Sequence, residues 1–179
     1  MTNAELAILS LVAEQPRHGY EIEQVIEARG MRDWTAVGFS SIYYLLKKLE
    51  KADLITAEIA KSTRGLGRKV YHITPAGRAA CKEAVQEALS TPQPCYSPFQ
   101  LGLANLPTLT QEEVLAALHT YHTTLQEQLD QLTTKQEAQQ PLPYFVDAMF
   151  DLSLAQIKTE ADWVAGFIQQ IIQESEGSL

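Results

Sequence analysis

Three lysines and two tyrosines are spaced so that one short helix would carry them together. Residues 40–52, SSIYYLLKKLEKA, have apolar residues at i, i+3, i+4, i+7 and i+10, which form one stripe of an α-helix. The opposite side carries Ser41, Tyr44, Lys47, Lys48 and Lys51, with Tyr43 at its border. Ammonium groups neutralise phosphate, and hydroxyl groups donate hydrogen bonds to it. The pattern favours a nucleic-acid contact, and an amphipathic helix with a solvated lysine face is the alternative.

A strand, a basic loop and a second strand follow this helix. Residues 54–59, LITAEI, read as a short strand, and residues 70–74, VYHIT, alternate apolar and polar side chains as a strand does. The intervening segment 61–69, KSTRGLGRK, is predicted to be a flexible loop long enough to reach past the domain. Helix, hairpin and basic tip predict a winged helix-turn-helix, with the helix in the major groove and the wing on the flanking backbone.

Two shorter helices are expected before this segment. Thr2 and Glu5 have the spacing of a capping box at the start of the first. The second is expected at about 19–29, with Gly30 placed to end it. Tyr20 lies in its first turn, in the helix that crosses the DNA backbone in such domains. We expect its hydroxyl to bind phosphate; packing beside the third helix is the alternative.

The rest of the chain is expected to be helical. A linking helix is predicted at about 75–90, and three prolines within 90–98 mark a boundary. Two long amphipathic helices then form an αα-hairpin. The expected segments are a winged helix-turn-helix domain with its linking helix (1–88), a linker with a short helical piece (89–109), a long-helix dimerisation domain (110–173) and a tail (174–179). The fold class is thus mostly α with a small β-hairpin wing.

The apolar faces of the two long helices are too long for the small winged domain to cover. Left in water, they would exceed the apolar patch usual for a monomer, so we expect them to pack on a second copy. The residues expected to make this dimer are Leu118, Tyr121, Leu125, Leu129, Phe145, Met149, Leu152, Val164, Ile168 and Ile171.

Charge is distributed unevenly along the 179 residues, whose formal net charge is −8. Residues 1–88 contain 12 Lys and Arg against 11 Asp and Glu, whereas residues 89–179 contain 2 against 11. The acidity therefore lies away from the helix and wing, and it does not count against DNA binding. With 45% apolar residues, no run of about 20 apolar residues and no signal-peptide pattern, a soluble cytoplasmic protein is expected.

Three stretches of this chain, HGYEI (18–22), SIYYLLKKLE (41–50) and GRKVYHITPAGR (67–78), resemble the PadR family of transcriptional regulators in order and spacing. The similarity is strong over about residues 4–88 and loose beyond. It implies a dimeric DNA-binding regulator, most often a repressor, on a palindromic operator. The DNA-binding residues expected on this basis are Tyr20, Ser40, Ser41, Tyr43, Tyr44, Lys47, Lys48, Arg64, Arg68 and Lys69.

The resemblance also implies an effector, because similar proteins respond to phenolic acids, drugs or other small aromatic molecules, although some have no known ligand. Trp163 and Tyr144 are the aromatic candidates for such a pocket, and dimer packing is their alternative role.

Other chemistry has little support in the sequence. No nucleophile elbow, phosphate-cradling loop or carboxylate pair is present, so we expect neither an enzyme nor a cofactor. His119 and His122 have helical spacing but lack a ligand motif, which favours solvated histidines over a metal site. Cys81 and Cys95 are expected to be free thiols, with a redox switch as the less favoured reading.

Two classes of function remain at this stage. The first is a dimeric DNA-binding regulator. The second is a winged-helix protein-interaction module whose basic face binds an acidic partner. The tyrosines of the helix and the arginines of the wing favour the first.

Overall fold

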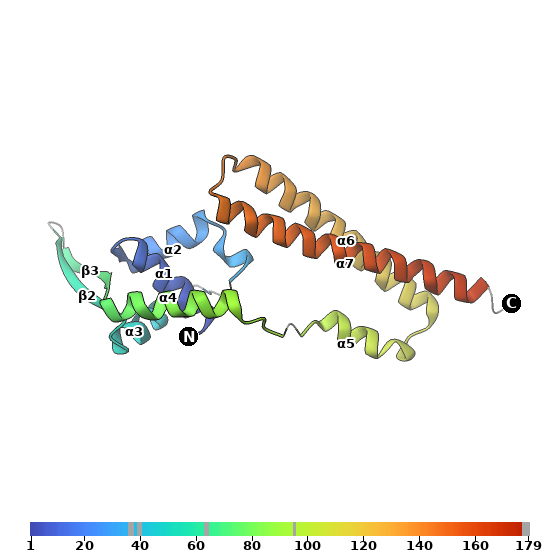
Figure 1. Cartoon of the computed structure of the whole chain (residues 1–179), viewed down its shortest axis with the longest axis horizontal. Helices are drawn as coiled ribbons and strands as arrows, with labels where there is room; N and C mark the ends of the chain where they lie inside the picture. Colours follow the sequence, from blue (N-terminus) through green and yellow to red (C-terminus); the bar gives the residue numbers. More distant parts are fainter. Residues whose placement is uncertain (36–37, 39–40, 63–64, 95, 177–179) are drawn as a thin grey trace. The chain divides into compact units, whose positions relative to one another are not determined.

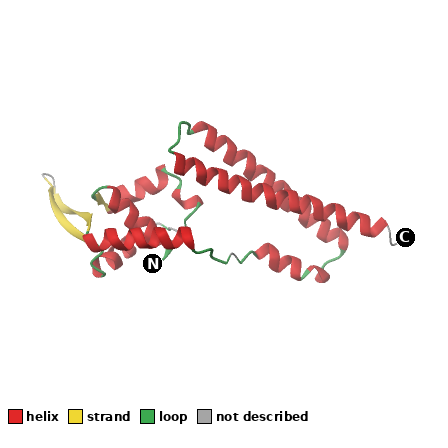
Figure 2. Cartoon of the chain, in the orientation of Figure 1, coloured by secondary structure: helices red, strands yellow, loops and turns green. Residues whose placement is uncertain are grey.

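The structure is a computed structural model, and it describes residues 1–35, 38, 41–62, 65–94 and 96–176. The chain divides into two compact units, residues 1–94 and 95–179 (Figure 1). Figure 2 shows that helices make up most of both and that the strands belong to the first. The predicted fold class, mostly helical with a small β wing, is confirmed.

The first unit is a three-helix body with a small sheet and a departing helix. Its elements are α1 (Asn3–Glu14), β1 (Arg17–His18), α2 (Gly19–Ala28), the 3-10 helix η1 (Met31–Asp33), α3 (Ser41–Lys51), β2 (Ile55–Ser62), β3 (Gly65–Ile73) and α4 (Pro75–Ser90). The predicted apolar stripe of α3 is buried at Ile42, Leu45, Leu46 and Leu49, where it meets Ile8 and Leu9 of α1 and Ile22 and Ile26 of α2 in one core. Burial of this stripe turns the polar face of α3 outward.

The sheet has three antiparallel strands in the order β1-β3-β2, rather than the hairpin alone. In the added strand, Arg17 pairs with Tyr71 and His18 with Val70. The predicted loop at 61–69 is too long, because β2 continues to Ser62 and β3 begins at Gly65. Backbone groups make the ladder, so the polar and basic side chains of this stretch do not prevent pairing.

The junction between α3, the wing and α4 is held by backbone geometry. Asp53 has φ 56°, and the amides of Asp53 and Leu54 bond to the carbonyls of Glu50 and Leu49 at 3.1 and 3.0 Å. These bonds form a Schellman motif at the end of α3. The Thr74 hydroxyl donates to the Asp53 carbonyl at 2.7 Å and accepts from the Gly77 amide at 2.9 Å, which begins α4. The helix α3 and the wing thus share one rigid corner.

The second unit consists of α5 (Pro98–Ala104), the 3-10 helix η2 (Leu106–Thr108), α6 (Gln111–Ala138) and α7 (Tyr144–Glu176). A capping box of Thr110 and Glu113 begins α6. The helices α6 and α7 lie side by side (Figure 1) and bury Val114, Leu118, Leu125, Ala161, Val164 and Ile168. Among the described residues, no helix is both long and apolar enough to span a bilayer.

Candidate nucleic-acid interface

The outer face of α3 presents hydroxyl and ammonium groups to solvent. Tyr43 is 57% exposed and Tyr44 66%, and Lys47 is exposed one turn further along. The Ser41 hydroxyl donates to the Gly38 carbonyl at 2.5 Å and is partly used within the chain. Ser40 lies outside the described residues. This face could bind a phosphate-lined groove while the opposite stripe stays in the core.

Lys48 makes an ion pair that the sequence did not indicate. Its ammonium lies 2.5 Å from a carboxylate oxygen of Glu5, which is buried at the start of α1. Glu5 also accepts from the Thr2 amide at 2.8 Å. The bonds from Lys48 and Thr2 lower the pKa of Glu5 to about 2 and outweigh the cost of burial. Lys48 therefore ties the recognition helix to α1, and its charge is already partly compensated.

The wing contributes a second internal pair. Lys69 lies 3.3 Å from Glu50, joining β3 to the end of α3. Arg68 is exposed, and within the ranges the structure describes neither Arg68 nor Lys47 forms an ion pair. Arg64 lies outside the described residues. Of the predicted basic contacts that can be placed, Lys47 and Arg68 are the two whose charges are uncompensated.

The start of α2 lies beside β3. Tyr20 is 57% exposed, and its hydroxyl accepts from the Gln24 amide at 3.1 Å, so a hydrogen remains to donate. His18 had no partner visible in the sequence, yet its Nδ1 lies 2.9 Å from the Lys69 carbonyl oxygen. Its amide also donates to Glu21 at 2.7 Å. His18 therefore joins α2 to the wing.

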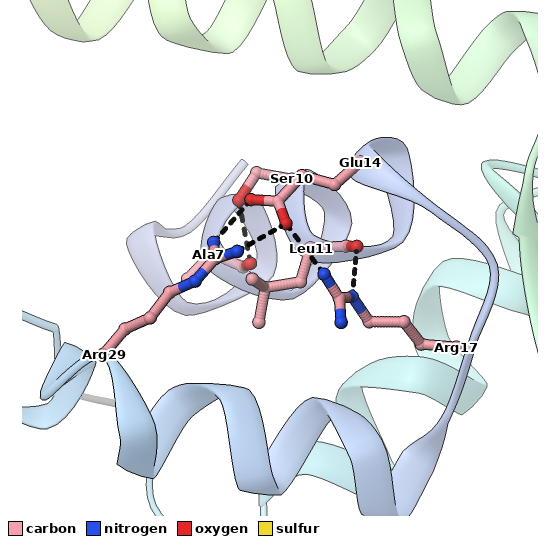
Figure 3. Close-up of polar contacts among 6 residues, drawn as sticks. All are labelled: Ala7, Ser10, Leu11, Glu14, Arg17 and Arg29. Carbon is pink, nitrogen blue, oxygen red and sulfur yellow. Dashed lines mark hydrogen bonds and ion pairs between the residues drawn. The ribbon is translucent and has the colours of Figure 1, made fainter. Parts of the chain in front are cut away.

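A charged cluster that sequence reasoning missed connects α1, β1 and α2 (Figure 3). The Glu14 carboxylate accepts two hydrogen bonds from Arg29, at 2.6 and 2.9 Å, and one from Arg17 at 2.8 Å. The Arg17 guanidinium is nearly buried and also donates to the Leu11 carbonyl at 3.0 Å. The bond from Arg29 is the main reason that the pKa of Glu14 is lowered. The cluster holds β1 in place, and β1 in turn supports the wing.

The residues predicted to make a dimer fall into three groups. Leu118, Leu125, Val164 and Ile168 are buried inside the second unit. Tyr121, Leu129 and Ile171 are partly exposed. Phe145, Met149 and Leu152 are 58%, 38% and 60% exposed, at helical spacing along the start of α7.

The two predicted effector residues lie far apart on α7. Trp163 is half-exposed and packs against Phe99 and Phe167, with ring centroids 6.0 and 5.1 Å away. Tyr144 is 87% exposed and lies 19 residues earlier, about 28 Å along the helix at 1.5 Å per residue. One small molecule cannot contact both side chains of a single chain.

An apolar cavity of about 190 Å³ lies beside Phe99, the ring that packs against Trp163. Its lining residues are Phe99, Gly102, Leu103, Leu106, Leu109, Val114, Ala117, Leu118 and Tyr121. Phe99 stacks on Tyr121 with centroids 4.3 Å apart, and the Tyr121 hydroxyl donates to Glu160 at 2.8 Å. Burial and this bond raise the pKa of Tyr121 to about 12. The hydroxyl therefore stays protonated above the pH at which an ordinary tyrosine ionises.

Other candidate chemistry is sparse. No cluster of three or more potential metal-ligating side chains occurs among the residues that the structure describes. His119 is exposed and His122 half-buried on α6. Burial raises the pKa of the Cys81 thiol, which lowers its thiolate fraction, and Cys95 lies outside the described residues.

An exposed recognition helix beside a basic wing defines the chain as a winged helix-turn-helix DNA-binding protein. Residues 8–83 match the model of the transcriptional regulator PadR-like family. A protein of Lysinibacillus sphaericus named "Uncharacterized protein X" is 36% identical over 80 residues, which are 45% of this chain and 72% of that protein. The chain therefore belongs to the PadR-like family of transcriptional regulators.

Solved structures show the same fold over nearly the whole chain. Bacillus subtilis PadR in complex with operator DNA has a TM-score of 0.77 at 20% identity, covering 93% of this chain and 98% of that one. The same protein in complex with p-coumaric acid scores 0.73 at 21% identity, covering 93% and 97%. The PadR-like regulator BC1756 of Bacillus cereus scores 0.64 at 19% identity, covering 96% and 97%.

Proposed function

We propose that this chain is a homodimeric repressor that binds a palindromic operator through α3 and the wing and is released by a small aromatic effector. The observation that carries the DNA contact is the exposed face of Tyr43, Tyr44 and Lys47 on α3, with Arg68 on the adjoining wing. Tyrosine hydroxyls and unpaired cations at such a helix suit base edges and phosphates. Lys48 and Lys69 support the geometry of this face through Glu5 and Glu50.

The dimer rests on the apolar side chains at the start of α7. Phe145, Met149 and Leu152 form one exposed stripe that α6 does not cover. A second copy of the chain would bury it and present two α3 helices to the DNA. Two-fold pairing of this kind matches an operator with two half-sites about one helical turn, roughly 34–36 Å, apart.

The effector proposal rests on the cavity beside Tyr121. Its volume of about 190 Å³ and its apolar lining suit an aromatic ring, and p-coumaric acid is bound in the Bacillus subtilis structure. Trp163 remains a candidate because it packs on Phe99, which lines the cavity. Binding to one dimer geometry better than another would shift the spacing between the α3 helices.

The test begins with a duplex that the full-length protein selects from a randomised library. Affinity for this duplex is then measured over a range of salt concentrations for the wild type, Lys47→Ala and Arg68→Ala. Each variant should lower the magnitude of the salt slope by about one unit, the loss of one phosphate contact. The exposed Lys158 of α7 provides a matched control, and Lys158→Ala should keep the wild-type slope.

A failure to select any duplex would contradict the DNA-binding function and favour the acidic-partner alternative. Selection of a duplex with unchanged slopes in both variants would place the contact elsewhere on the protein.

A further inference from the structure

We propose that Gly19 is a positioning residue for DNA recognition, because its lack of a side chain lets the ring of Tyr43 lie against the start of α2. Gly19 is buried and cannot itself reach a duplex. The inference rests on the proposed function, since it assumes that Tyr43 contacts DNA.

The close approach is specific to one ring. A Cβ atom added at Gly19 would lie 2.7 Å from Cε1 of Tyr43 and 3.4 Å from its Cδ1 and Cζ. Carbon atoms in favourable contact are about 3.5–4.0 Å apart, so the first distance is a clash. All three nearest atoms belong to Tyr43, and none belongs to the backbone. The space at Gly19 is therefore occupied by this ring.

The backbone that leads into Gly19 is held by three contacts of His18. His18 pairs with Val70 in the sheet, and its amide bonds to Glu21 in the first turn of α2. Its Nδ1 lies within hydrogen-bond distance of the Lys69 carbonyl. An added methyl group could not easily move this segment, so the Tyr43 ring must turn instead.

Tyr43 is at once supported and accessible. More than half of its surface is exposed, while one ring edge contacts Gly19. A side chain held in one orientation loses less conformational freedom on binding than a free one. Gly19, on the neighbouring helix α2, therefore determines the position in which the Tyr43 hydroxyl is presented to DNA.

A purely structural role of Gly19 would give a different experimental result. If the glycine served only the fold, Gly19→Ala would reduce stability, and Tyr43 would be irrelevant to its effect on DNA. Under our proposal the ring turns away, the core is untouched, and alanine suits a helix at least as well as glycine. Stability is then retained while affinity falls.

A double-mutant cycle in the full-length protein separates the two explanations. The variants are Gly19→Ala, Tyr43→Ala and the double variant, and the probe is the duplex selected by the wild type. Gly19→Ala should weaken binding about tenfold, as expected for one lost hydrogen bond to a charged group. In the Tyr43→Ala background, the same substitution should change affinity less than about twofold. The thermal midpoints of all variants should stay at or above that of Tyr43→Ala.

Gly166→Ala is the matched control, because a Cβ there meets nothing within 4 Å, and its affinity should equal that of the wild type. Equal losses from Gly19→Ala in both backgrounds would overturn the proposal, as would wild-type affinity or failure to fold in Gly19→Ala. Wild-type affinity in Tyr43→Ala would instead remove the recognition role of Tyr43 under the proposed function, and this inference with it.

Discussion

The two units of the chain cover their apolar side chains to different degrees. In the first, α1, α2, α3 and the sheet enclose one core, and its polar anchors Glu5 and Arg17 are themselves nearly buried. In the second, α6 and α7 are 28 and 33 residues long but bury a short row of side chains between them. Phe145 and Leu152 of α7 remain exposed. The first unit thus has a complete core, whereas the second leaves apolar side chains of α7 in solvent.

Removing the second unit should have the largest effect on function. We expect residues 1–94 to fold as a monomer, because their core is complete. Their affinity for the selected duplex should fall by about 100-fold or more, since two linked half-site contacts bind far better than one. Sedimentation and binding titrations of the full chain and the fragment measure both quantities. If the full chain is a monomer, or if the fragment binds with full affinity, the second unit is not what provides dimerisation and high affinity.

A point variant tests the same claim without truncation. Leu152→Glu places a charge in the exposed stripe of α7 and should dissociate the dimer. Lys158→Glu adds negative charge at a helical position that points away from the stripe, and it should leave the dimer intact. Dissociation by both variants would indicate a general effect of charge on this acidic unit.

Gly77 in the first unit and Gly166 in the second differ in how closely their surroundings are packed. An added Cβ at Gly77 would overlap the Leu54 carbonyl oxygen and crowd Ile73 at 2.9 Å. Because a backbone atom cannot turn aside, Gly77→Ala should lower the free energy of unfolding of the first unit by about 3 kcal/mol. Gly166→Ala meets open space in α7 and should raise stability by about 0.5–1 kcal/mol. Denaturant unfolding of both variants checks the contrast, and a tolerated Gly77→Ala would contradict it.

The sequence predicted the features that depend on local spacing. The stripe through Ile42 and Leu49 repeats at helical intervals, so periodicity located it. The capping box of Thr2 and Glu5 was recognised from the fixed spacing of its two residues. The family resemblance rested on motifs in the first unit, and the matching family model covers residues 8–83 there.

Features that depend on distant residues were missed. The strand β1 has two residues, too few to show alternation, and it forms because β3 offers an open edge. The partner of Lys48 lies 43 positions earlier, so its exposed appearance in the sequence concealed an ion pair. The wing loop was predicted too long because basic residues and glycines suggest a loop, whereas backbone pairing does not depend on them. The sequence thus predicted the fold better than it predicted which basic side chains are left unpaired on the DNA-binding face.

The stability contributed by two similar capping boxes, one in each unit, should depend on pH to different degrees. The pKa of Glu5 is lowered to about 2, chiefly by Lys48, and that of Glu113 is lowered by Thr110. A lowered pKa stabilises the folded state fully above the ordinary value near 4.5, and the contribution is lost as pH falls toward 2. Glu5→Gln should therefore reduce stability by about 1–2 kcal/mol at pH 7 and by little near pH 2.

Glu113→Gln is the matched control in the second unit. Glu113 lacks an equivalent of Lys48 among its pKa determinants, so we expect a smaller change at neutral pH. Chemical unfolding of both variants at several pH values decides between them. An effect of Glu5→Gln that is independent of pH would show that its ionised form is not the stabilising one.

The smallest effect is expected at Asp53, where the tightly built corner of the first unit still contains strain. Its φ of 56° is unfavourable for a residue with a Cβ, and the Schellman motif at this position prefers glycine. Asp53→Gly should raise the free energy of unfolding by about 0.5–1 kcal/mol, because the relief of strain exceeds the added freedom of the unfolded chain. Asp53→Ala separates backbone strain from charge, since it keeps the Cβ and removes the carboxylate from the negative end of α3. If both variants stabilise the protein equally in denaturant titrations, charge is the cause. If only glycine does, the corner is strained because the bonds from Thr74 and Leu54 hold it there.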